Sequence, residues 1–226
     1  MYQFPENFHR LSDDFLKLYF KPTPKVIIED QIIVVEKFFS EKFCDELIRS
    51  LENSPDVNLE TTPLIKSKEY AARYNDRYLT TDFQATTSLW NYLRKVLMQD
   101  VGYEDEELEL VKDNFSDAIF LNPQLRIYRY QKGHHFGKHY DESVKCPVEN
   151  KSKPKIGKTK WTLLIYLTGG KEFVGGGTIF YPRKALNIHP TKGMALLHKH
   201  GDDCLQHEAE IVKQGVKWVL RSDVVY

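Results

Sequence analysis

The second half of the chain is a succession of short apolar runs separated by glycine-containing turns, and this pattern constrains the fold more than any other feature. Nine runs rich in β-branched and aromatic residues follow residue 117, and none has the 3.6-residue period of a helix. They span residues 118–121, 124–131, 135–141, 160–168, 177–181, 185–189, 194–198, 204–212 and 216–225. Strands at this spacing predict a jelly roll, that is, a double-stranded β-helix.

The region before residue 118 mixes strand and helix signals. Residues 32–35 are all Ile or Val and indicate a strand. Ser40 is a typical N-cap for an apolar-periodic helix, and a second amphipathic helix starts near Asp82. We therefore expect an α+β protein that is mainly β and forms one domain over all 226 residues. Its helix-rich supporting region (1–117) packs on the outside of a jelly-roll core (118–226).

The longest predicted interruption of the strands is residues 145–160. This segment holds six lysines and two prolines. Its polar composition predicts a mobile loop. Because the loop follows a strand with candidate metal ligands, we expect it to form a substrate rim together with residues 73–77.

Charge and composition exclude several classes of protein. The 32 basic and 32 acidic residues cancel, so no global charge indicates a nucleic-acid partner. No apolar run approaches the roughly 18 residues of a membrane span, and the charged N-terminal residues do not resemble a secretory signal. Three widely spaced cysteines suit a reducing compartment. We expect a protein of the cytoplasm or nucleus that is not secreted.

Two His-x-Asp motifs, His139-x-Asp141 and His200-x-Asp202, are candidate metal-binding pairs. Residues i and i+2 of a strand point to the same face, as two ligands of a 2-His-1-carboxylate Fe(II) site require. The third ligand has to come from a strand that is distant in sequence. His207 lies 66 residues beyond Asp141 but only five beyond Asp202. The spacing therefore favours His139, Asp141 and His207, with a structural His–Asp hydrogen bond as the alternative.

The pair His198-x-His200 offers a rival metal site, because it resembles the His-x-His motif of a cupin. A cupin normally has a glutamate a few residues later and then a distant histidine. Here Glu208 follows His200 only after eight residues, and no histidine comes after it. The cupin pattern is therefore disfavoured.

Lys217, ten residues beyond His207, falls in an apolar strand. A cation buried in an apolar barrel needs an anion. A dicarboxylate bound to iron at one end would supply that anion at its other end. Tyr130 and Tyr166 lie on strands expected to line the same cavity, and each offers a hydroxyl group. Ordinary core packing is the alternative for both tyrosines.

Together, these motifs resemble the Fe(II)/2-oxoglutarate-dependent dioxygenase superfamily, in particular its prolyl-4-hydroxylase-like branch. The matching segments are 125–130, 133–141, 162–167, 175–178, 190–197, and His207 with Lys217. Upstream, residues 72–77 are similar to the Arg-x-Asn-Asp-Arg stretch of some relatives.

The resemblance implies roles for ten residues. Three would bind the metal: His139, Asp141 and His207. Three would hold the distal carboxylate of 2-oxoglutarate: Lys217, Tyr130 and Tyr166. Four would contact the substrate: Arg73, Asn75, Asp76 and Arg77. The implied cofactors are Fe²⁺, 2-oxoglutarate and O₂, with ascorbate as a further candidate.

The implied activity is the hydroxylation of a protein or peptide side chain. Oxidative demethylation of a nucleobase is the first alternative, but that branch typically places Arg rather than Lys beneath the distal carboxylate. A catalytically inactive binding module on the same barrel is the second alternative, and the intact set of candidate residues argues against it. The motifs identify neither the substrate nor the oligomeric state.

Overall fold

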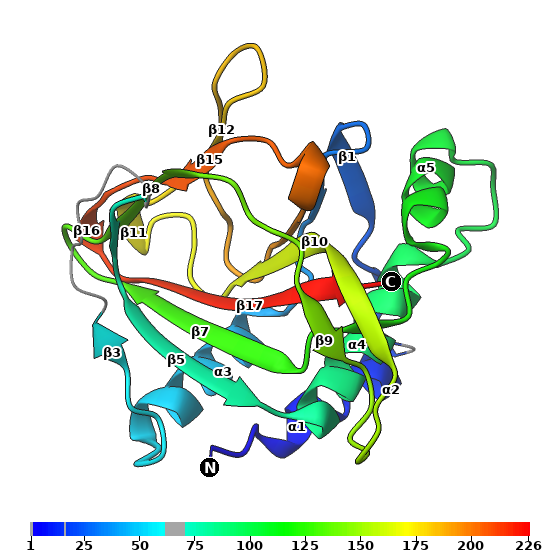
Figure 1. The fold of residues 1–226 in the computed structure, drawn as a ribbon, viewed down its shortest axis with the longest axis horizontal. Coiled ribbons are helices and arrows are strands. Elements are labelled where there is room, and N and C mark those ends of the chain that lie inside the picture. The colour runs from blue at the N-terminus through cyan, green and yellow to red at the C-terminus, as the bar shows by residue number, and fades with distance from the viewer. Residues whose placement is uncertain (1, 16, 62–70) are drawn as a thin grey trace.

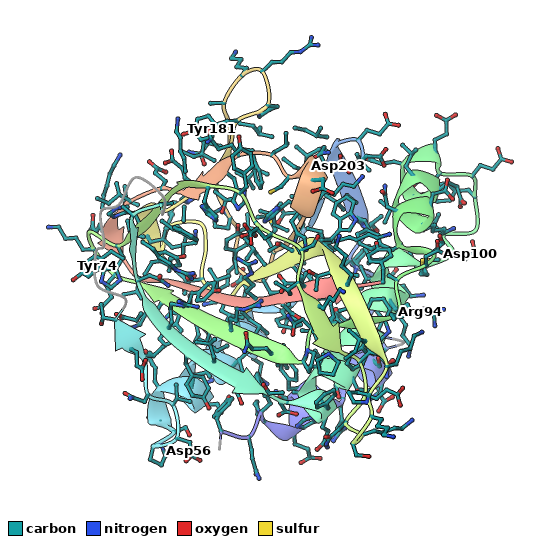
Figure 2. All side chains as sticks on the ribbon, in the orientation of Figure 1. Asp56, Tyr74, Arg94, Asp100, Tyr181 and Asp203 are labelled. Atoms are coloured by element: carbon teal, nitrogen blue, oxygen red, sulfur yellow. The ribbon has the colours of Figure 1, made fainter. Side chains whose placement is uncertain are left out.

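The computed structural model describes residues 2–15, 17–61 and 71–226. They form two main antiparallel β-sheets and a separate two-stranded pair, with helices against the outer face of the largest sheet (Figure 1). Side chains fill the space between the sheets (Figure 2). This arrangement confirms the expected jelly roll and its external helices. No helix of the described residues is both long and apolar enough to cross a membrane.

The major sheet runs in the order β1-β2-β14-β10-β17-β7-β5-β3. Its strands are β1 (Pro24–Ile28), β2 (Ile32–Val35), β3 (Glu60–Thr61), β5 (Asp76–Thr81), β7 (Gln124–Tyr130), β10 (Ile156–Tyr166), β14 (Ala195–Lys199) and β17 (Lys217–Val225). The short β6 (Phe120–Leu121) pairs with β17, and β9 (Lys145–Pro147) pairs with β10.

The minor sheet runs in the order β13-β12-β15-β8-β4. Its strands are β4 (Arg73–Tyr74), β8 (His135–His139), β12 (Thr178–Phe180), β13 (Leu186–Ile188) and β15 (His207–Ala209). A further pair joins β11 (Phe173–Gly175) to β16 (Val212–Gly215). Buried residues of both sheets, among them Tyr128, Tyr166 and Phe180, form the apolar core between them.

The helices are α1 (Glu6–His9), α2 (Leu11–Phe15), α3 (Glu41–Asn53), α4 (Phe83–Leu97), α5 (Glu106–Phe115) and the 3₁₀ helix η1 (Gly201–Asp203). Ser40 caps α3 by accepting a hydrogen bond from the Phe43 amide, and Asp82 caps α4 in the same way. The apolar faces of α3 and α4 join the major sheet in one core that includes Leu47, Leu89 and Leu163.

Two sequence-based expectations are wrong in detail. Residues 145–160 are not simply a loop, because β9 and the start of β10 pair as a hairpin. The run 204–212 is not one strand, because it divides into β15 and the start of β16.

Asp76 in β5 is a buried anchor between strands. Its carboxylate is 2% exposed and accepts hydrogen bonds from Arg129 Nε at 2.8 Å, Gln131 Nε2 at 2.9 Å and Thr61 Oγ1 at 2.8 Å. Burial alone would raise the pKa of Asp76, but these donors outweigh it and lower the pKa. The stabilisation is therefore present above the unfolded-state pKa and is lost as the pH falls through the lower folded-state pKa.

We expect Asp76→Asn to lower the free energy of unfolding at pH 7 by about 2 kcal/mol, because charge-assisted hydrogen bonds are lost. The difference from the wild type should shrink below about pH 4. Urea unfolding at several pH values measures both effects, with the exposed Asp117→Asn as the control. Equal stability of Asp76→Asn and wild type at pH 7 would contradict the anchoring role.

Candidate metal centre

Pairing between β8 and β15 brings together the two histidines predicted from the sequence. His139 lies directly opposite His207 in the register, and their ring centroids are 4.3 Å apart. Asp141 follows β8. One ligand atom from each of these three residues falls within 4.8 Å of the others. The Nε2 atoms of His139 and His207 lie 3.6 and 3.8 Å from the Asp141 carboxylate.

Both histidines are held in the form that binds a metal. His139 Nδ1 donates to the Gly137 carbonyl at 2.8 Å, and His207 Nδ1 donates to the Leu205 carbonyl at 2.9 Å. Since Nδ1 carries the proton, the lone pair is on Nε2, which faces the carboxylate. Burial lowers the pKa of His139 to about 4 and also lowers that of His207. Both rings are therefore neutral at neutral pH.

Asp141 is 8% exposed and is fixed by Arg221 and Thr162. Arg221 contacts both carboxylate oxygens, with Nη2 at 3.0 Å and Nη1 at 3.3 Å, while Thr162 Oγ1 donates at 2.8 Å. Burial alone would raise the pKa of Asp141, but the Arg221 guanidinium holds it well below its usual range. The site thus presents an ionised carboxylate beside two neutral imidazoles.

His200 supports the site from behind. Its Nδ1 bonds to Thr162 Oγ1 at 2.9 Å and its Nε2 bonds to Thr159 Oγ1 at 2.8 Å. Because both ring nitrogens have partners, His200 has no lone pair free for a metal. This arrangement removes the basis for the cupin reading of His198-x-His200.

His198 in β14 is different, because its Nε2 is buried and has no hydrogen-bond partner. The ring is 2% exposed, and Nε2 lies 3.7 Å from Asp141 Oδ2. A third imidazole therefore faces the same carboxylate.

Lys217 lies in the same cavity as the candidate ligands and is 2% exposed. Its Nζ donates to the Gly176 carbonyl at 2.6 Å, and no ion pair of the described residues involves it. Burial lowers the pKa of Lys217 to about 7, against a weaker opposing effect of Glu210. The cavity thus contains a buried amine that lacks an anionic partner.

Tyr130 and Tyr166 flank this amine, as the sequence predicted. Lys217 Nζ is 5.2 Å from the ring centroid of Tyr130 and 5.3 Å from that of Tyr166. The Tyr166 hydroxyl pairs with Thr178 Oγ1 at 2.7 Å. Burial raises the pKa of Tyr130 to about 12, so its hydroxyl stays protonated and able to donate.

The four residues expected to contact substrate divide into two pairs. The Arg73 guanidinium stacks at 4.7 Å over Tyr128 and at 4.6 Å over Phe136, both of which line the cavity. Arg77 also lies over Tyr128, at 5.8 Å. In contrast, Asn75 is 0% exposed and Asp76 is the buried anchor described above. Burial therefore argues against direct substrate contacts by Asn75 and Asp76.

Arg221 belongs to none of the motifs in the sequence, although its position carries a signal. Lys217, Val219 and Arg221 alternate along β17, and all three line the cavity. A period of two from Lys217 would therefore have selected Arg221. No comparable pattern in the sequence indicates that Thr162 and His200 support Asp141, because that role depends on which strands are neighbours in the sheet.

Residues 125–222 match the family model of the 2OG-Fe(II) oxygenase superfamily. This segment contains all the candidate ligands and Lys217, and the match confirms the resemblance noted from the motifs. No curated protein matches the chain at a significant level.

Several solved structures share the fold. A viral collagen prolyl hydroxylase from Paramecium bursaria Chlorella virus-1, in complex with 2OG, has 19% identity and a TM-score of 0.57 over 86% of this chain and 96% of its own. A Trichoplax adhaerens prolyl hydroxylase with a hypoxia-inducible-factor peptide has 13% identity and a TM-score of 0.56 over 97% and 91%. A Pseudomonas putida prolyl-4-hydroxylase has 11% identity and a TM-score of 0.53 over 96% and 98%.

The unpaired Lys217 predicts pH-dependent binding of 2-oxoglutarate. Above its pKa of about 7 the amine is neutral and must take up a proton to pair with a carboxylate. Affinity should therefore fall by up to about tenfold per pH unit above that value. Lys217→Ala should bind one to two orders of magnitude more weakly at pH 7, with little further pH dependence.

Calorimetric titration of Mn²⁺-loaded protein with 2-oxoglutarate between pH 6.5 and 9 measures this effect. Lys217→Arg keeps a cation and should retain part of the affinity. Wild-type affinity that stays constant across the range, or equals that of Lys217→Ala, would remove Lys217 from the cosubstrate site.

Proposed function

We propose that this chain, which carries a 2OG-Fe(II) oxygenase domain over residues 125–222, hydroxylates a side chain of a protein or peptide. One observation carries the proposal. Two neutral imidazoles, an ionised carboxylate and an unpaired buried amine line a single cavity. Such a cavity fits a divalent metal together with a dicarboxylate cosubstrate.

The donor set fits Fe²⁺. His139, Asp141 and His207 make up two imidazoles and one carboxylate, the combination that leaves neighbouring coordination positions open. When bound, iron would supply the oxygen activation by which 2-oxoglutarate and O₂ become succinate and CO₂ and the substrate gains a hydroxyl group. The protein positions the donors: Arg221 and Thr162 hold the carboxylate, and backbone carbonyls fix both rings.

Of the two cations that line the cavity, Lys217 is the better partner for the distal carboxylate of 2-oxoglutarate. The other cation of the cavity, Arg221, is already neutralised by Asp141 and by Asp223, which lies 3.2 Å from Arg221 Nη2. Among the described residues, the one hydrogen-bond partner of Lys217 Nζ is a backbone carbonyl. A carboxylate placed there would form charge-assisted hydrogen bonds shielded from water by Tyr130 and Tyr166.

A peptide is the substrate class that suits the surroundings of the cavity. Arg73 and Arg77 are partly exposed and stack over Tyr128, where they can contact backbone carbonyls or acidic side chains of a peptide. The zero net charge disfavours a nucleic acid as substrate. Two of the structurally similar proteins support this choice, one a collagen prolyl hydroxylase and the other bound to a peptide fragment.

The proposal places the protein in a reducing compartment, the cytoplasm or nucleus. The three cysteines support this assignment, because all of them are buried and none forms a disulfide bond. Assays should therefore contain a reductant, and turnover should be compared with and without ascorbate.

We expect His139→Ala and His207→Ala each to abolish turnover, because too few donors remain to hold the metal. The assay measures succinate formed by iron-loaded protein with pooled proline-containing peptides, together with the mass increase of the peptides. Mn²⁺ affinity should fall in both variants. The matched control is His189→Ala, since His189 is an exposed histidine outside the cavity.

Turnover or Mn²⁺ affinity unchanged in either ligand variant would remove that residue from the centre. Succinate production that no peptide stimulates, with 2-oxoglutarate still bound, would contradict the peptide substrate and leave the metal site intact.

A further inference from the structure

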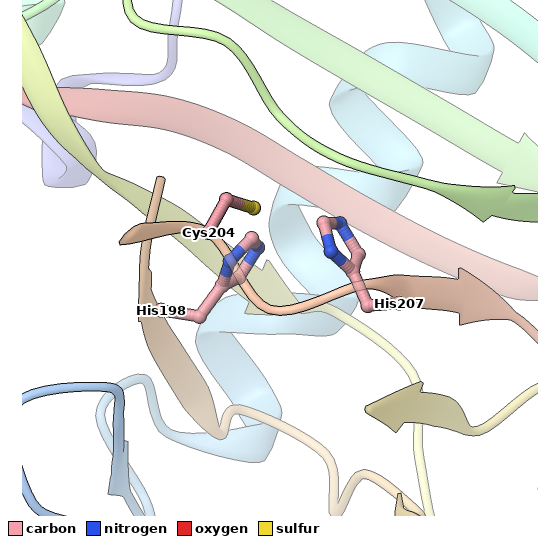
Figure 3. Close-up of side chains that lie close together, drawn as sticks. All are labelled: His198, Cys204 and His207. Atoms are coloured by element: carbon pink, nitrogen blue, oxygen red, sulfur yellow. The ribbon is translucent and has the colours of Figure 1, made fainter. Parts of the chain in front are cut away.

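A second set of metal-binding side chains overlaps the candidate iron centre. His198, Cys204 and His207 point toward one another (Figure 3), and one ligand atom from each falls within 4.8 Å of the others. All three residues are buried. The set shares His207 with the first centre but adds a thiol, which is a softer donor than any in the His139–Asp141–His207 group.

His198 offers a ring nitrogen that is available to a metal. Its Nδ1 contacts the Lys199 carbonyl at 3.4 Å, but its Nε2 is buried and has no hydrogen-bond partner, whereas both nitrogens of His200 are satisfied by threonine hydroxyls. A buried polar atom without a partner costs free energy. Coordination of a cation would remove that cost.

The backbone around Cys204 directs its sulfur toward the site. Gly201, with φ of +81°, starts the 3₁₀ turn η1, and its amide donates to the Asp141 carbonyl at 2.9 Å. The turn returns the chain so that Cys204 Sγ accepts a hydrogen bond from the Asp141 amide at 3.3 Å. Hydrogen bonds of this kind orient a sulfur ligand and tune its affinity for metals.

Asp141 lies beside two of these three residues and offers a fourth donor. Its Oδ2 lies 3.7 Å from His198 Nε2 and 3.8 Å from His207 Nε2. Tetrahedral zinc, with bonds of 2.0–2.3 Å, separates its ligand atoms by roughly 3.3–3.8 Å. Two imidazoles, one thiolate and one carboxylate form a donor set that zinc accepts.

We propose that His198, Cys204, His207 and Asp141 form a Zn²⁺ site that excludes iron. Both metals require His207 and Asp141, so one chain holds one metal at a time. Zinc binding replaces the thiol proton of Cys204 with a zinc–sulfur bond and releases that proton. Zinc would thus inhibit the enzyme by occupying two of the iron ligands. This inhibition goes beyond the proposed hydroxylation and rests on it only through the residues that both sites share.

The test compares zinc and iron affinities in Cys204→Ser and wild type, with Cys146→Ser as the control at a second buried cysteine. Competition with a chromophoric chelator under anaerobic conditions measures both affinities. Cys204→Ser should weaken zinc binding by at least about tenfold and leave Fe²⁺ affinity within about threefold, because a hydroxyl is a poor zinc ligand. His198→Gln should show the same selectivity, and Cys146→Ser should change neither affinity.

Co²⁺ provides a readout that is independent of activity. Bound to wild type without iron, it should show the near-ultraviolet absorption of a cobalt–thiolate bond, which Cys204→Ser should abolish. Adding Zn²⁺ to iron-loaded protein should release one equivalent of iron per zinc bound.

Zinc affinity that is unchanged in Cys204→Ser, or zinc and iron bound together at one equivalent each, would overturn the proposal. These results are independent of the proposed function. Loss of the zinc site would leave iron and 2-oxoglutarate binding intact, whereas a protein that binds zinc but neither iron nor 2-oxoglutarate would refute the hydroxylase alone.

Discussion

The buried carboxylate of Asp141 is the group on which the site depends. Placing a charge between two sheets is costly unless other charges and hydrogen bonds compensate it. Arg221 and Thr162 provide this compensation, and Arg221 is in turn paired with Asp223, whose other oxygen lies 2.6 Å from Arg126 Nη1. The result is a row of alternating charges with no net charge, beside which the neutral imidazoles can present their lone pairs.

Lys217 stands apart from that row, and this difference explains how the cavity can select its occupants. A divalent metal adds two positive charges beside Asp141, and a dicarboxylate adds two negative charges between the metal and Lys217. Bound together, the two leave the net charge of the interior unchanged, whereas either one alone does not. The low pKa of the Lys217 amine reflects the same imbalance, since burial outweighs the effect of Glu210 and no described residue forms an ion pair with the amine.

The fold and the clustering of the candidate metal ligands could be predicted because they depend on strand pattern and spacing. Period-two alternation and glycine turns mark the strands, and His139, Asp141 and His207 are separated by the spacing that such strands require. Other features depend on neighbours distant in sequence. Lys158 and Lys160 give residues 145–160 the composition of a loop, yet Thr159 between them is buried. A Cβ on Gly157 would lie 2.3 Å from Val225 Cγ1, so the close approach of the C-terminal strand explains this glycine. An Arg-x-Asn-Asp-Arg stretch likewise does not reveal that Asn75 and Asp76 point inward.

A crystal structure of the protein with Mn²⁺ and 2-oxoglutarate under anaerobic conditions would test the assignment of this site. We predict the metal on the Nε2 atoms of His139 and His207 and on one oxygen of Asp141. The distal carboxylate of 2-oxoglutarate should lie against Lys217 Nζ, with Arg221 still bound to Asp141. A metal that leaves His139 free, or a dicarboxylate that displaces Asp141 from Arg221 and leaves Lys217 without an anion, would contradict it.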